Sequence, residues 1–309
     1  MRRATTTAAV LMTLALGARA AAQERHVEVA AGERLRVVEA GRGEPVVLIP
    51  GLLGSAFAYR QLTARLVETG RRVVVVEPLG FGGSSRPRDA DYSLTAQADR
   101  IAAVLDALAV EPAVVVAHAV GASMALRLAW RHPERVRAVV SLDGGPAEAA
   151  ATPGLRRAMR FAFLARLLGG RDRIRRTVRE TLRERSADPS WVTEDVVEGY
   201  MAGAGRDADE TLQGLRYMAK AREPEPLAPR LAQVRCPVWL VTGDAGRARG
   251  VTDDDIRLLA DGLDTFRVET VRGAGHFLFE ENPRAVATAV DRALTATRPA
   301  PLLASGPGR

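Results

Sequence analysis

The sequence predicts an α/β fold, in which a mostly parallel sheet is wound by helices on both faces and a block of helices is inserted after the sixth strand. Short apolar runs alternate with segments of helical spacing in the first half of the chain. Such alternation is typical of parallel strands joined by right-handed crossovers. Residues 147–230 hold several helical stretches and no β-rich run, and strands return from residue 237.

Length and composition agree with one large domain that carries an insertion. The chain has 309 residues, of which 47% are hydrophobic. The net charge is +7 and its basic residues are almost all arginine, but aromatic residues make up only 5% and no nucleic-acid motif is present. We therefore expect no nucleic-acid partner. The single cysteine, Cys236, opens an apolar run and is expected in a buried strand.

The N-terminus has the pattern of a secretory signal peptide over residues 1–20. Arg2-Arg3 is followed by the mostly apolar run Ala8–Gly17, which is too short to span a bilayer, and by the small-residue site Ala18-Arg19-Ala20. We expect cleavage after Ala20 or Ala22, a secreted or periplasmic protein, and no transmembrane segment in the mature chain. Sec and twin-arginine export both remain open.

The first elements alternate as an α/β sheet requires. Two segments that mix apolar and polar positions suit an antiparallel edge, and two continuous apolar runs suit buried parallel strands. Helical spacing and a terminal glycine mark the helices between them. The expected strands are His26–Ala30, Leu35–Glu39, Pro45–Ile49 and Val73–Val76, and the expected helices are Phe57–Glu68 and Leu94–Leu108.

A strand, a tight turn and a helix occupy Ala113–Arg131. The β-branched run is followed by a mostly small-residue segment, Ala117-His118-Ala119-Val120-Gly121, after which a helix is expected. This layout is that of a nucleophile elbow, which usually reads G-x-S-x-G and lifts one side chain above the sheet edge. Here the tip is Ala119, which has no oxygen, sulfur or carboxylate.

The second half of the chain completes the sheet around the insertion. Val136–Leu142 is the strand before the helical cap, and Pro237–Thr242 is the strand after it. The core is expected at residues 25–146 and 231–297, the cap at 147–230, and a disordered tail at 298–309. The remaining expected elements are the cap helices Thr152–Leu168, Asp172–Arg185, Thr193–Ala204 and Asp207–Ala221, the helices Thr252–Leu263 and Pro283–Leu294, and the strand Thr265–Val271.

Several motifs in this order resemble the α/β-hydrolase superfamily, in its branch with a helical cap. Pro50-Gly51 stands at the oxyanion loop, and Gly80-Phe81-Gly82-Gly83-Ser84 is similar to the glycine-rich loop. Trp130–Val136 is similar to the end of the elbow helix. Gly273–Phe277, with Glu280–Pro283 after it, is similar to the loop of the catalytic histidine. The resemblance covers Val27 to Leu294 and implies a small-molecule ligand or substrate, with no metal and no cofactor.

When the family's catalytic residues are assigned to this chain, the nucleophile has no counterpart. The resemblance implies His276 as the proton acceptor and the N–H groups of Leu52 and Val120 as the oxyanion hole. Ala119 fills the nucleophile position and cannot form a covalent intermediate. No serine elsewhere in the sequence is expected to share the geometry of the elbow tip.

The sequence offers more than one candidate for the acid that orients His276. The family's usual acid position after strand Pro237–Thr242 holds a glycine, and Asp244 falls two positions early. Some members carry the acid one strand earlier, a position that matches Asp143. We predict Asp143 and leave Asp244 and Asp253–Asp255 open.

The function therefore divides into three readings. The protein is a catalyst that uses His276 and Asp143 as a general base without an acyl-enzyme, a non-catalytic ligand-binding pseudoenzyme, or an ester- or lactone-type hydrolase disabled by replacement of serine with alanine. Ordinary Ser-His-Asp catalysis is excluded in all three. In each, Gly51, Ser55, Phe81 and His118 are expected to border a pocket for a small, largely apolar molecule.

Overall fold

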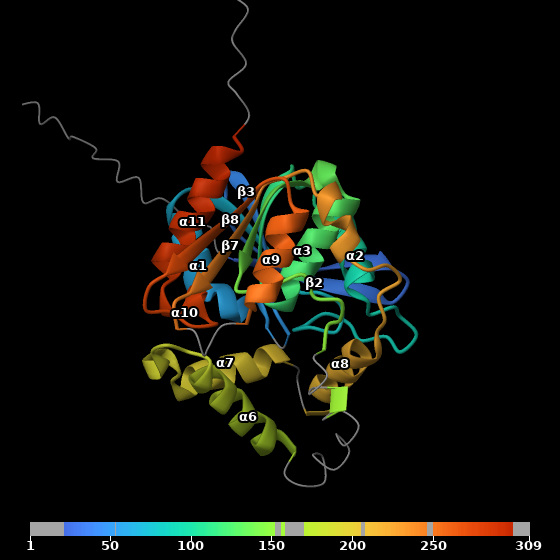
Figure 1. Ribbon diagram of the computed structural model, residues 1–309. Coiled ribbons are helices and arrows are strands. Elements are labelled where there is room, and N and C mark those ends of the chain that lie inside the picture. Colours follow the sequence, from blue (N-terminus) through green and yellow to red (C-terminus); the bar gives the residue numbers. More distant parts are fainter. Residues whose placement is uncertain are drawn as a thin grey trace, which may run out of the picture.

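The computed structural model describes residues 22–52, 54–151, 156–157, 170–204, 208–245 and 250–298. Eight strands form one twisted sheet in the order β1-β2-β4-β3-β5-β6-β7-β8 (Figure 1). The strands are β1 (Gln23–Ala30), β2 (Glu33–Gly41), β3 (Glu44–Ile49), β4 (Arg71–Val76), β5 (Ala113–His118), β6 (Val136–Leu142), β7 (Val238–Gly243) and β8 (Phe266–Val271).

The sheet is antiparallel at one edge and parallel elsewhere, as predicted. β2 pairs antiparallel with both β1 and β4, and every later pairing is parallel. The register sets Ile49 beside Ala117 and His118 beside Leu142. The carboxyl ends of β3, β5 and β6 therefore meet at one edge, where open α/β sheets bind their ligands.

Helices cover both faces of the sheet, each over its own apolar cluster. Buried residues of α2, α3 and α9 pack in one cluster, and those of α1 and α11 pack in the other. Figure 1 shows the two groups on opposite sides of the strands. The helices are α1 (Arg60–Glu68), α2 (Leu94–Ala107), α3 (Val120–Arg131), α9 (Asp253–Gly262), α10 (Leu278–Glu281) and α11 (Pro283–Ala296).

Short 3-10 segments modify the predicted helix boundaries. The helix expected at Phe57–Glu68 begins as the 3-10 turn η1 (Ala56–Tyr59), because the Ser55 hydroxyl accepts a hydrogen bond from the N–H of Phe57. The short helix α10, at Leu278–Glu281, is not predicted by the sequence pattern. Further 3-10 turns are η2 (Pro133–Arg135), η3 (Pro189–Trp191) and η4 (Ala228–Gln233).

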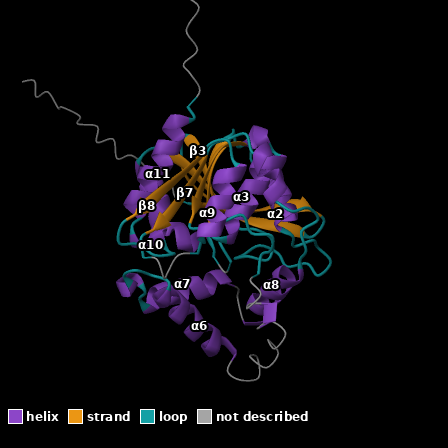
Figure 2. Ribbon diagram, in the orientation of Figure 1, coloured by secondary structure: helices purple, strands orange, loops and turns teal. Residues whose placement is uncertain are grey.

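The cap is a separate helical layer at the carboxyl edge of the sheet (Figure 2). Its helices are α6 (Gly170–Glu184), α7 (Glu194–Ala204) and α8 (Ala208–Lys220). Of the predicted helix Thr152–Leu168, the structure describes only residues 156 and 157, which are helical. The predicted signal peptide and all but the first residue of the predicted tail lie outside the described residues.

Two glycines let α7 lie directly on η1 and the loop before it. A Cβ at Gly199 would overlap the Phe57 ring, and a Cβ at Gly203 would overlap the Ser55 side chain. The spacing of four residues places both glycines on one face of α7. The cap helix and the loop after β3 therefore approach backbone to side chain, with no room for a methyl group between them.

A buried arginine joins the two stems of the cap to the elbow helix. The guanidinium of Arg127 on α3 lies 2.9 Å from Glu148 and 3.2 Å from Glu223. Glu148 also accepts hydrogen bonds from the N–H groups of Leu227 and Ala228. The entry and exit of the cap are thus fixed to α3, whose first residue follows the elbow tip.

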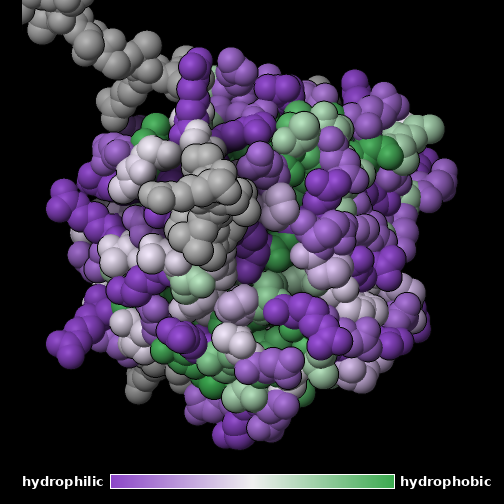
Figure 3. Space-filling model, turned by 90° about the horizontal axis from the view of Figure 1, so that it is seen from above, coloured by the Kyte–Doolittle hydropathy of each residue, from purple (hydrophilic) through white to green (hydrophobic). Residues whose placement is uncertain are grey.

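The surface at the end of the molecule opposite the cap is mostly hydrophilic, with apolar side chains in small areas (Figure 3). Among the described residues, only Leu258 and Val268 are large hydrophobic residues that are more than a third exposed. No helix in the described part of the chain combines the length and the apolar character needed to cross a bilayer.

Candidate active site at the carboxyl edge of the sheet

The elbow retains the sharp turn of a nucleophile elbow, with Ala119 at its tip. Ala119 has φ 50° and ψ −121°, a conformation that is strained for a residue with a side chain. Its N–H donates to the carbonyl of Leu142 at 3.1 Å, and its carbonyl accepts from Ala122 at 3.0 Å. A Cβ at Gly121 would lie 2.9 Å from the Ile49 carbonyl oxygen, so the turn requires glycine there.

His276 and Asp143 form a buried hydrogen-bonded pair beside the elbow. The Nδ1 of His276 lies 2.6 Å from Oδ2 of Asp143, and both side chains are almost fully buried. Burial lowers the pKa of His276 below its ordinary value, although the hydrogen bond that it donates to Asp143 acts to raise it. The imidazole is therefore neutral at pH 7. With Nδ1–H donating to the carboxylate, Nε2 carries the lone pair of a base.

Other hydrogen bonds fix Asp143 in place. It also accepts from the Thr242 hydroxyl at 2.9 Å and from the N–H of Gly250. Its φ of 49° lies in the left-handed region, which aspartate tolerates better than most residues. Of the other candidate acids, Asp244 accepts a hydrogen bond from the N–H of Gly273, and Asp255 caps α9 at Thr252. Asp143 is the carboxylate that contacts His276.

The cap holds the histidine loop through its backbone. The N–H of His276 donates to the carbonyl of Arg185 at 2.8 Å. The Glu281 carboxylate accepts from Gly275 at 2.7 Å on the core side and from Ala187 at 2.6 Å on the cap side. Glu281 belongs to the motif predicted for the histidine loop, but the sequence indicates no role for it, because its partners in the cap are distant along the chain.

His118 faces the cavity next to His276. The ring centroids are 4.4 Å apart, and His118 Nε2 lies 3.1 Å from the carbonyl oxygen of His276. A carbonyl only accepts, so His118 carries its proton on Nε2. Burial lowers the pKa of His118 well below its ordinary value, which keeps it neutral. A Cβ at Gly51 would lie 2.9 Å from His118 Nδ1, so Gly51 borders His118 closely.

The backbone donors predicted for an oxyanion hole are not used elsewhere in the described part of the chain. Leu52 and Val120 are half-buried, and neither N–H donates a hydrogen bond to another described residue. Ser123, the nearest serine along the elbow helix, is not available as a nucleophile. Its hydroxyl donates to the Gly145 carbonyl and accepts from the N–H of Ala147.

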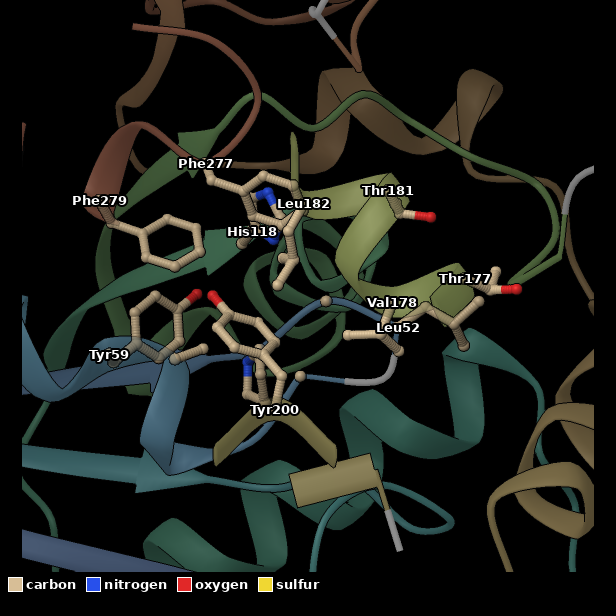
Figure 4. Close-up of a pocket in the computed structure, with 14 residues that line it drawn as sticks. Leu52, Tyr59, His118, Thr177, Val178, Thr181, Leu182, Tyr200, Phe277 and Phe279 are labelled. Atoms are coloured by element: carbon tan, nitrogen blue, oxygen red, sulfur yellow. The ribbon is translucent and has the colours of Figure 1, made fainter. Parts of the chain in front are cut away.

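A cavity of about 110 Å³ lies between the elbow edge and the cap (Figure 4). Aromatic and aliphatic side chains supply most of its wall, and Figure 4 shows Tyr59 and Phe279 at one end and Leu52 and Val178 at the other. Among the predicted site residues, Gly51, Leu52 and His118 line it. The described residues that line it are Pro50, Gly51, Leu52, Gly54, Ala58, Tyr59, His118, Thr177, Val178, Thr181, Leu182, Tyr200, Phe277 and Phe279.

The two tyrosines in the cavity wall already use their hydroxyl protons. Tyr59 donates to the carbonyl of Ile49 at 2.9 Å, and Tyr200 from the cap donates to Glu280 at 3.0 Å. Glu280 also contacts Arg60 at 2.5 Å, and burial raises the pKa of this carboxyl. The cavity therefore presents rings more than free hydroxyls to a ligand. No local sequence signal marks Tyr59 or Glu280, because both act through long-range contacts.

The remaining predicted site residues lie near this cavity without lining it. Ala119 and Val120 form the elbow turn, and His276 lies beside it. Ser55 caps η1 and packs under α7 instead of facing the cavity. Phe81 lines a second, smaller cavity. Of the aromatic residues in the cap, Tyr200 is in the wall, whereas Phe161 and Phe163 lie outside the described residues.

Comparison with known proteins agrees with this geometry. The family model for the alpha/beta hydrolase fold matches residues 44–220. The 2-hydroxymuconate semialdehyde hydrolase of Pseudomonas sp. strain CF600 is 39% identical over 131 residues, or 41% of this chain and 46% of that protein. A cis-3-alkyl-4-alkyloxetan-2-one decarboxylase of Shewanella oneidensis is 35% identical over 125 residues, or 40% of this chain and 39% of that protein. The matches thus span less than half of these relatives.

Solved structures extend the likeness over most of the chain. Cfl2 from Burkholderia cenocepacia is 28% identical with a TM-score of 0.71, covering 87% of this chain and 94% of that one. The epoxide hydrolase CorEH, at 19% identity and a TM-score of 0.75, covers 90% and 100% and supports the fold alone. The sheet order, the elbow, the histidine–aspartate pair and the family match together place this chain in the α/β-hydrolase fold family.

Proposed function

We propose that this protein binds a small, largely apolar carbonyl compound at the elbow and hydrolyses it without a covalent intermediate. His276 Nε2 takes a proton from water, and the water oxygen attacks the carbonyl carbon. The N–H groups of Leu52 and Val120 hold the resulting oxyanion. When the tetrahedral adduct collapses, the leaving oxygen takes the proton back from His276. Asp143 keeps the imidazole in the reactive tautomer.

The observation that carries this proposal is the His276–Asp143 hydrogen bond of 2.6 Å, which is retained beside an elbow that has no nucleophile. Loss of the nucleophile from a serine triad removes on the order of a millionfold in kcat, and binding and the oxyanion hole leave roughly 10³ over water. A positioned base adds about 10²- to 10⁴-fold. A slow hydrolase of activated substrates fits these magnitudes.

A non-catalytic binding protein is the second candidate. It is favoured by the cavity wall, which includes His118 but neither Ala119 nor His276. A ligand held there by aromatic rings would not reach the base. For both candidates we propose export to the periplasm or beyond, from the basic, apolar and small-residue pattern of residues 1–20.

Hydrolysis of p-nitrophenyl acetate and butyrate by three forms of the protein tests the proposal. The unmodified protein should turn over slowly with no burst of nitrophenol, and His276→Ala should lower the rate by about 10²- to 10⁴-fold. Ala119→Ser should show a burst from an acyl-enzyme.

Each reading predicts a different pattern. A burst from the unmodified protein would contradict the proposal. Activity in Ala119→Ser alone would indicate a hydrolase that lost its serine. Silence in all three forms, with ligand-dependent thermal stabilisation, would indicate a binding protein.

A further inference from the structure

Leu52 lines two cavities. On one side its side chain closes the aromatic cavity, at the end away from Tyr59 and Phe279 (Figure 4). On the other side it lines a second cavity of about 10 Å³. Among the described residues, Leu52 is the one that lines both cavities.

The second cavity is small, and both polar and apolar atoms line it. Phe81 reaches it from the glycine-rich loop, and Leu215 and Met218 reach it from α8 of the cap; all three side chains are buried. A space of about 10 Å³ is close to the least that holds one water molecule. The first cavity is about ten times larger, and a cavity of roughly 150 Å³ elsewhere is known to hold benzene. The two spaces thus differ strongly in the size of group they accept.

The main chain of the same residue carries the proposed oxyanion donor. A carbonyl oxygen bound at the Leu52 N–H leaves two substituents on its carbon, which point in different directions from the donor. We infer, on the basis of the proposed function, that one substituent is a flat apolar group in the aromatic cavity and that the other is short and lies against Leu52. Leu52 is then the residue that sets the length of the short substituent.

Shortening Leu52 to alanine removes three carbons from the wall and joins the two spaces. Each methylene that gains burial strengthens binding by about 0.8 kcal/mol, or roughly fourfold. A ligand with a longer alkyl arm should therefore gain at least tenfold in affinity, relative to a short-armed ligand, once the arm can pass residue 52. The oxyanion donor is unaffected, because it belongs to the backbone.

Alkyl phenyl ketones test this directly, because they offer a flat ring, a carbonyl and an alkyl arm of chosen length and are not hydrolysed. Acetophenone, butyrophenone and hexanophenone would be titrated calorimetrically into the full chain and into Leu52→Ala. In the unmodified protein, hexanophenone should bind no more tightly than acetophenone. In Leu52→Ala the hexanophenone preference should rise at least tenfold.

Two further variants keep the result interpretable. Leu108→Ala shortens another half-buried leucine, packed on the same side of the sheet but in neither wall, and should leave the preference unchanged. Leu52→Val preserves more packing and should give a smaller shift in the same direction. Binding of the ketones with an unchanged length preference in both Leu52 variants overturns this inference alone. Failure of every ketone to bind any form overturns the proposed function as well.

Discussion

Ala119 occupies a backbone conformation that glycine adopts with less strain. A residue with a side chain at φ 50° and ψ −121° costs on the order of 1–3 kcal/mol. We predict that Ala119→Gly raises the free energy of unfolding by about 0.5–1 kcal/mol, because relief of strain exceeds the added entropy of the unfolded chain. Urea unfolding measures this change.

The matched control lies in the middle of the same helix. Ala125→Gly, at an ordinary helical position, should lower the free energy of unfolding by at least about 1 kcal/mol, through backbone entropy and lost packing. Equal losses in the two variants would show that the elbow tip is not strained. The alanine would then be an unconstrained residue and not the remnant of a nucleophile turn.

At the scale of elements, Glu281 connects the histidine loop to the cap. One oxygen accepts from Gly275, and the other accepts from Ala187 and Asp188. We predict that Glu281→Ala costs about 1–3 kcal/mol of stability, since three backbone donors lose a charged acceptor. Amide hydrogen exchange should accelerate at these three positions before it does in the sheet. The Arg292–Glu269 pair on the surface gives the comparison, and Glu269→Ala should cost no more than about 1 kcal/mol.

Individual elements also show how much of the structure can be predicted from the sequence. The strand Val136–Leu142 was predicted with the bounds that the structure shows, because a continuous β-branched run has few other folds open to it. Asp143 is predicted as the acid with Asp244 and Asp253–Asp255 left open, because the His276–Asp143 contact spans 133 residues and no local pattern reports it. The wall made by Tyr59, Tyr200 and Leu52 depends on how the cap seats on the core, which helical spacing does not encode.

At the scale of the whole molecule, buried titratable groups set the response to acid. Both His118 and His276 have lowered pKa values in the fold, so the unfolded chain binds more protons as the pH falls through about 6.5. We predict that stability is full above pH 6.5 and falls below it, by at most about 1.4 kcal/mol per pH unit for each histidine. Thermal unfolding between pH 5 and 8 measures the slope.

Two variants check the sign of this dependence. His118→Asn should flatten the acid loss, because one fewer buried imidazole takes up a proton on unfolding. Glu280 acts in the opposite direction, since its raised pKa means that the fold binds the extra proton above pH 4.5. Glu280→Gln should therefore steepen the loss, and a flatter profile in that variant would contradict this account.

The two glycines of α7 have a consequence for traffic in and out of the aromatic cavity. At Gly199 and Gly203 the cap packs tightly against Phe57 and Ser55, so lifting α7 would break both contacts. On the α6 side, the exposed Thr177 and Thr181 line the same cavity. Rotation of these two small side chains would be enough to let a ligand pass. A ligand would then enter and leave beside α6, while α7 stays packed against the core.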